Sequence, residues 1–123
     1  MTGPVADLYE KDHRIGHWHD RAMRDPWVAR DPDGKGWLMY FTARAPGIAE
    51  PNAGGAIGLA TSPDLRNWTL QPPVFSGGFG QLEVPQVFNI GPDGSACSAH
   101  PAINGRKPIA ARTLNPRSPA LII

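Results

Sequence analysis

Short apolar runs separated by turn-forming residues recur along the chain as far as Phe88. They come about every ten residues, and none shows the apolar spacing of an amphipathic helix. Glycine and proline, 14 of each among 123 residues, divide the runs from one another. Short strands at regular intervals with turn signals between them predict an all-β protein.

Four of these runs predict the strands of one antiparallel sheet. WLMYFTAR, rich in β-forming residues, is expected to be buried on both faces, and the small residues of AIGLATS suit close backbone packing. After a glycine-rich loop, PPVFSGGFG at 72–80, a fifth strand is expected in LEVPQVF at 82–88. The four sheet strands are expected at Pro26–Ala29, Trp37–Arg44, Ala56–Ser62 and Trp68–Gln71.

The predicted four-stranded sheet has two faces to cover, and alone it would expose apolar surface to water. It therefore needs neighbouring sheets, which suits one blade of a β-propeller. Residues 89–123 differ, because all ten aromatic residues lie at or before Phe88 and five prolines come after it. We predict a partial propeller at 1–88 and an irregular tail at 89–123 that buries little.

Charge and hydropathy exclude several classes of partner. The net charge of +1, from 12 basic and 11 acidic residues, gives no electrostatic case for nucleic acid or an anionic membrane. No apolar run reaches the roughly 18 residues of a membrane span, and the first residues lack the order of a signal peptide. We therefore expect a cytoplasmic chain without a membrane or nucleic-acid partner. The single cysteine, Cys97, excludes an internal disulfide.

The triplet Arg-Asp-Pro occurs twice, at 24–26 and at 30–32. An apolar run comes directly after the first copy, whereas the second continues into Asp33-Gly34 and Gly36. Asp-Pro and Asp-Gly steps mark a tight connection between strands, so the second copy is predicted to be a turn. The first copy is either another turn or a chemical site.

Three blocks of sequence, taken together, resemble glycoside hydrolase family 32. They are HDRAMRDPWVARDPDGKGWLMYFTAR at 19–44, GAIGLATSPDLRNWTLQPPV at 55–74 and GFGQLEVPQVF at 78–88. Members of this family are five-bladed β-propellers that hydrolyse β-fructofuranosides such as sucrose and fructans, and families 43 and 68 share the architecture. The resemblance implies about one and a half blades of antiparallel sheet, a small carbohydrate substrate and no cofactor.

The resemblance also implies roles for individual residues. Asp25 matches the family's transition-state stabiliser, which binds sugar hydroxyls, and Glu83 matches the general acid that protonates the leaving oxygen. Asp25 and Glu83 are expected to converge on one cavity. Further residues expected to bind substrate are Arg24, Trp27 and, at the rim of this cavity, Phe79 and Gln81.

Each of these residues also has a purely structural interpretation. In the structural interpretation, Asp25 is merely a residue of an Asp-Pro turn and Glu83 is an exposed strand residue. Arg24 either pairs with these acids and orients them or is a solvated arginine. Three strand tryptophans, which could stack on sugar rings, are expected chiefly in the core: Trp27, Trp37 and Trp68.

One part of the family pattern is missing from the sequence. The family's nucleophile lies in an Asn-Asp-Pro-like motif of the first blade, but Asp7, Asp12 and Asp20 lack the expected neighbours. Covalent catalysis without a nucleophile loses nearly all of its rate, so we expect a truncated and largely inactive family member. The alternatives are a non-catalytic sugar-binding protein and a family 43-like arabinosidase or xylosidase. His17 and His19 lack a third ligand, so no metal site is predicted.

Overall fold

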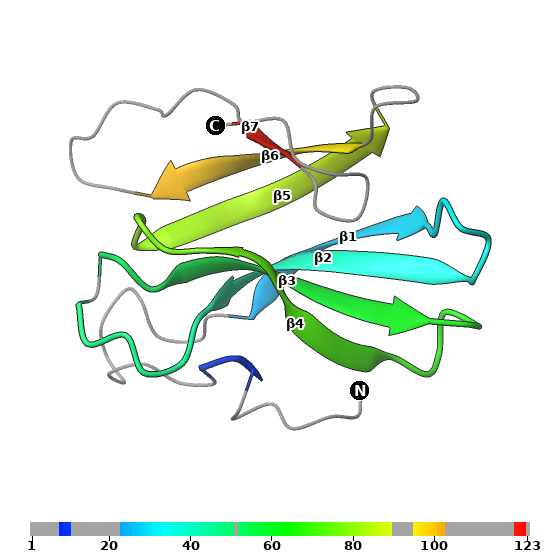
Figure 1. The fold of residues 1–123 in the computed structure, drawn as a ribbon, viewed down its shortest axis with the longest axis horizontal. Helices are drawn as coiled ribbons and strands as arrows, with labels where there is room; N and C mark the ends of the chain where they lie inside the picture. Colours follow the sequence, from blue (N-terminus) through cyan, green and yellow to red (C-terminus); the bar gives the residue numbers. More distant parts are fainter. Residues whose placement is uncertain (1–7, 11–22, 51, 90–94, 103–119, 123) are drawn as a thin grey trace.

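The computed structural model describes residues 8–10, 23–50, 52–89, 95–102 and 120–122. These residues form seven strands in two sheets, which lie next to each other in Figure 1. The protein is all-β, as the spacing of the apolar runs predicts. The first sheet has the order β1 (Arg24–Arg30), β2 (Trp37–Arg44), β3 (Gly55–Ser62) and β4 (Thr69–Ser76), and the second has the order β5 (Gln81–Asn89), β6 (Ser95–Ala102) and β7 (Ala120–Ile122).

The first sheet is antiparallel throughout and keeps the chain order, as predicted. The bounds of β2 are those expected from WLMYFTAR, and β2 pairs with β3 along its whole length, from Trp37 opposite Ser62 to Arg44 opposite Gly55. Continuous pairing of this kind satisfies the backbone donors and acceptors of a strand that is largely shielded from water.

Burial of β2 on both faces is confirmed from Tyr40 to Arg44, where every residue is buried, whereas the first three residues of the strand are half-buried. Alternate side chains enter two apolar clusters on opposite sides of the sheet. One cluster contains Tyr40, Ile57, Phe79, Leu82 and Val87, and the other contains Tyr9, Phe41, Ala43, Ala56, Ala60 and Leu70. Each large apolar side chain that is fully buried in this way contributes about 1.5–3 kcal/mol. The sheet thus packs on β5 at one face and on Tyr9 at the other.

The small residues of β3 permit close packing, as predicted. A Cβ atom placed on Gly58 would lie 2.3 Å from Cε2 of Phe41, so the aromatic ring rests directly on the glycine backbone. Any larger residue at this position would displace the ring from the second cluster.

The extent of β4 differs from the prediction. We expected a strand ending at Gln71 and a loop from Pro72, but β4 continues to Ser76. Its register shifts, because Leu59 pairs with Gln71 and Ile57 pairs with Phe75, so both prolines lie in a bulge opposite β3. Proline is tolerated in a bulged edge strand, since the missing amide would not have completed the ladder.

The prediction of an irregular tail is wrong for two segments. β6 pairs antiparallel with β5 and β7 pairs parallel with β6, and both lie beyond residue 89. The prediction rests on the lack of aromatic residues and of apolar alternation after Phe88. A segment such as SACSAHPA needs only a neighbouring strand edge, because backbone hydrogen bonds carry the pairing.

Candidate functional site

Two strands open with the same irregularity. β1 has a register shift between Arg24 and Trp27, and the bulged Asp25 has φ of 54°. β5 has a shift between Glu83 and Gln86, and the bulged Val84 has φ of 50°. Left-handed backbone at a non-glycine residue costs about 1–3 kcal/mol and is sustained only by surrounding contacts. Each bulge re-aims the side chains at its strand opening, which is where the predicted acids lie.

Arg24 joins the two strand openings. Its Nη2 lies 2.5 Å from Oε1 of Glu83, and its Nε lies 3.6 Å from Oδ2 of Asp25. Nη2 also donates to Oε1 of Gln81. A guanidinium group can hold several acceptors at fixed angles because its five donors lie in one plane. The reading of Arg24 as a solvated arginine is therefore wrong, since one cation links both predicted acids.

Asp25 is held across the molecule through a single oxygen. Its Oδ2 accepts a hydrogen bond of 3.1 Å from Oγ1 of Thr42 on β2 and one of 3.3 Å from the backbone amide of Val84 on β5. Within the described residues, no hydrogen bond or ion pair reaches Oδ1. Asp25 is thus anchored by one oxygen and can offer the other to a ligand.

The charged groups are reachable from solvent, but the polar groups beneath them are not. The exposed fraction of the side chain is 30% for Arg24, 32% for Asp25 and 36% for Glu83. Gln81 and Thr42 below them are buried. Ion pairs with this exposure are screened and contribute on the order of 1 kcal/mol each, so they orient the acids more than they stabilise the fold.

A close approach of backbone fixes the start of β5. The Gly55 amide donates to the Phe79 carbonyl at 2.7 Å, and a Cβ on Gly55 would lie 2.8 Å from that oxygen. Buried Arg44 adds a second tie, since it pairs with Glu10 at 3.1 Å and donates to the Gly80 carbonyl at 2.9 Å. These contacts place Gln81 and Glu83 against β1.

Three of the predicted ligand-binding residues have other surroundings than expected. Phe79 is buried in the apolar cluster between the sheets, and Gln81 lies under Arg24, so neither forms a rim. Trp27 was expected chiefly in the core, but it is 37% exposed, and its indole Nε1 donates to the Val87 carbonyl at 3.0 Å. An indole whose nitrogen is bonded and which keeps part of its surface exposed is suited to stacking.

The other two tryptophans among the described residues, Trp37 and Trp68, are half-buried. Trp68 packs against the second apolar cluster, as the core reading predicts. Trp37 lies under the guanidinium of Arg30, at 4.4 Å from the ring centroid, in a cation–π contact.

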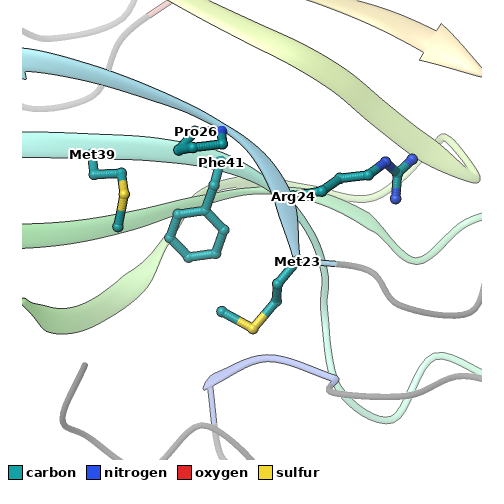
Figure 2. A pocket seen from close by; sticks show the side chains of 5 residues that line it. All are labelled: Met23, Arg24, Pro26, Met39 and Phe41. Atoms are coloured by element: carbon teal, nitrogen blue, oxygen red, sulfur yellow. The ribbon is translucent and has the colours of Figure 1, made fainter.

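A small apolar pocket of about 190 Å³ lies on the other side of β1, lined by Met23, Arg24, Pro26, Met39 and Phe41. Figure 2 shows the Arg24 guanidinium turned away from the two methionines and the phenylalanine. Asp25 and Glu83 do not line it. We expected these two acids to share one cavity. They instead meet at Arg24, on a partly exposed surface.

Sequence reasoning missed Thr42 and the Val84 amide. A hydroxyl group within an otherwise apolar strand was the available signal for Thr42, because such a group needs a partner once it is buried. The amide of Val84 left no signal, since its role depends on a bulge that brings β5 against β1.

Several expectations concern positions outside the described residues, namely Asp7, Asp12, His17, His19 and Asp20. In the described part of the chain, no three His, Cys, Asp or Glu side chains are grouped as metal ligands. The same part contains no helix with the length and apolarity needed to span a membrane. Comparisons of the chain with family models, curated proteins and solved structures find no match.

Proposed function

We propose that the chain is part of a five-bladed β-propeller of the family 32 type that acts on β-fructofuranosides. The observation that carries the proposal is the contact between two strand openings. Arg24 on β1 pairs with Glu83 on β5. Asp25, also on β1, accepts a hydrogen bond from the backbone amide of Val84, the residue after Glu83. The face of the first sheet packs against β5 of the second sheet, and the two acids lie close together near the starts of β1 and β5. This arrangement suits adjacent blades around a propeller axis.

Glu83 is the proposed proton donor. In glycosidic cleavage a carboxylic acid protonates the departing oxygen while the bond from that oxygen to the anomeric carbon breaks. One oxygen of Glu83 contacts Arg24, and its side chain is 36% exposed, so a ligand can reach the carboxyl group. Arg24 fixes the direction in which this group points.

Asp25 is the proposed sugar-binding carboxylate. Its Oδ2 is occupied by Thr42 and Val84, which leaves Oδ1 to accept a hydrogen bond from a sugar hydroxyl. Trp27, two residues further along β1, is a partly exposed aromatic residue against which the apolar face of a sugar can stack. A few polar anchors beside an aromatic surface are typical of small-molecule binding sites.

Hydrolysis through a covalent intermediate further needs a nucleophilic carboxylate. The sequence has no Asn-Asp-Pro motif, and the carboxylates that contact Arg24 within the described residues are Asp25 and Glu83. Sugar binding without turnover is therefore a second candidate function, favoured by this missing motif.

Sucrose with added azide tests both candidates. Azide can attack the fructosyl anomeric carbon in place of the nucleophile, while Glu83 gives its proton to the glucosyl oxygen, so the products are fructosyl azide and glucose. We expect glucose release that depends on azide and falls about 100-fold in Glu83→Gln, because general acid catalysis contributes about that factor or more. Glu50→Gln, an exposed loop glutamate, is the matched control and should leave the rate unchanged.

Calorimetric titration of the same proteins with methyl β-D-fructofuranoside completes the test. Binding without glucose release would assign the chain to the second candidate. Neither binding nor azide-dependent release, from a protein that melts cooperatively, would contradict the proposed function.

A further inference from the structure

Thr42 is a polar residue buried in the middle of the sheet. It lies on β2 between Phe41 and Ala43, opposite Arg24 in the register of β1, and it is 1% exposed. Its hydroxyl group donates to Oδ2 of Asp25 at 3.1 Å. A buried hydroxyl group is costly unless it is bonded, so this contact is part of the folded structure rather than a chance encounter.

The contact decides which oxygen of Asp25 faces outward. The terminal torsion of an aspartate is broad and roughly two-fold, so the carboxylate has little rotational preference of its own. Thr42 on β2, the Val84 amide on β5 and Arg24 beside it all lie against Oδ2. Among these three, Thr42 has the shortest contact and is the neutral donor supplied by the first sheet itself.

We propose that Thr42 is a positioning residue, which holds Asp25 through Oδ2 and presents Oδ1 to a ligand hydroxyl group. The identity of that ligand, a β-fructofuranoside, rests on the proposed function. The orientation of Asp25 does not, because it arises from contacts within the protein.

Thr42→Val removes the hydroxyl group and keeps the shape and β-propensity of the side chain. Thr42→Ser keeps the hydroxyl group and removes the methyl group. Thr61→Val is the matched control, since Thr61 on β3 of the same sheet accepts a hydrogen bond of 3.3 Å from Gln71. Thr42→Ala deletes the same hydroxyl group with less volume, and it replaces Thr42→Val if that variant does not fold.

The first measurement is calorimetric titration with methyl β-D-fructofuranoside. We expect Thr42→Val to raise Kd about tenfold, the effect of one hydrogen bond to a charged group, and Thr42→Ser to stay within about threefold of the wild type. Thr61→Val should bind as the wild type does. Equal affinity of Thr42→Val and the wild type would overturn the proposal.

The second measurement needs no sugar and separates the two proposals. The Val84 amide proton reports the position of Oδ2, so its NMR resonance should move in Thr42→Val and stay in place in Thr42→Ser and Thr61→Val. If the wild type does not bind the fructoside but this shift appears, the proposed function fails and the positioning of Asp25 stands. An unmoved Val84 resonance in Thr42→Val overturns the positioning role whatever the titration shows.

Discussion

The same three residues, Arg-Asp-Pro, occur at both ends of β1 and do different things there. Asp31 is bonded locally: its amide donates to the Gly36 carbonyl, and its Oδ1 accepts from the amide of Asp33 at 2.9 Å. Asp25 has no such local turn and accepts from Thr42 and Val84, which are distant in the sequence. The motif itself therefore does not determine the chemistry. The residues that come next in the chain, and those that pack against the aspartate, determine it.

The arginines of the two triplets, Arg24 and Arg30, also differ in the residues that they contact. Arg24 contacts Glu83 and Gln81 on the second sheet, whereas Arg30 stacks on Trp37, its own neighbour across the hairpin. One copy of the triplet joins two sheets, and the other closes a turn. Paired substitutions at equivalent positions can test this difference directly.

The largest expected contrast is between Asp25→Ala and Asp31→Ala. Under the proposed function, Asp25→Ala removes a charged acceptor of sugar hydroxyl groups and should raise the Kd for methyl β-D-fructofuranoside about 100-fold. Asp31→Ala removes only a turn contact and should leave Kd unchanged. Calorimetric titration of both variants, with their melting temperatures as a check on folding, measures the contrast. Similar losses in the two variants would show that the copies are not functionally distinct.

A smaller contrast is expected in stability between Arg24→Met and Arg30→Met. Arg24→Met leaves Glu83 without its cation and should lower the free energy of unfolding by about 1–2 kcal/mol, a value limited by solvent screening. Arg30→Met loses one exposed cation–π contact, worth about 0.5–1 kcal/mol. Urea unfolding of both variants provides the values.

A double-mutant cycle makes this second test specific. Glu83→Gln in the Arg24→Met background should cost less than Glu83→Gln alone, because the pair is already broken. Additive losses would mean that the ion pair contributes nothing to stability.

The number and order of the strands in the first sheet were predictable because their signals are local, although β1 begins before and β4 ends beyond the predicted bounds. Turn residues mark their ends, and the apolar run of β2 indicates burial on both faces whatever its neighbours are. The separation of Asp31 from Asp25 was predictable for the same reason, since Asp33-Gly34 adjoins only the second copy. β6 was not predictable from its own sequence, because its pairing depends on the edge that β5 presents.

Partners at the site were harder to predict than its acids. A resemblance indicates Asp25 and Glu83, whereas the sequence left open whether Arg24 pairs with them or is solvated. Gln81 was expected at a rim and lies beneath Arg24 instead, where its Oε1 accepts a hydrogen bond from Nη2 of Arg24. Such placements arise from contacts between residues far apart in the chain, which one sequence does not record.

The two bulges offer a third and smaller test. Val84 and Asp25 both have left-handed φ, but Val84 is 47% exposed and acts only through its amide, whereas Asp25 acts through its side chain. Val84→Gly relieves the strain of a β-branched residue and loses some backbone entropy, so we expect a net gain of about 0.5 kcal/mol in unfolding free energy. Asp25→Gly relieves similar strain and loses its contacts, so it should destabilise. Urea unfolding of both variants measures these changes in unfolding free energy. A lower unfolding free energy in Val84→Gly would mean that the Val84 side chain packs more than its exposure indicates.

The smallest expected effect concerns Asp64, a locally bonded aspartate like Asp31. The amides of Asn67 and Arg66, at 2.7 and 2.9 Å, lower the pKa of the Asp64 carboxyl group from 3.8 to about 2. Because the pKa is lower in the folded state, ionised Asp64 stabilises the fold above about pH 3.8, and this contribution disappears as the pH falls to about 2. The difference in urea midpoint between the wild type and Asp64→Asn should therefore be constant near neutral pH and narrow between these two values. A difference in urea midpoint that stays unchanged down to about pH 2 would show that the hydrogen bonds from the amides stabilise the fold without the negative charge of Asp64.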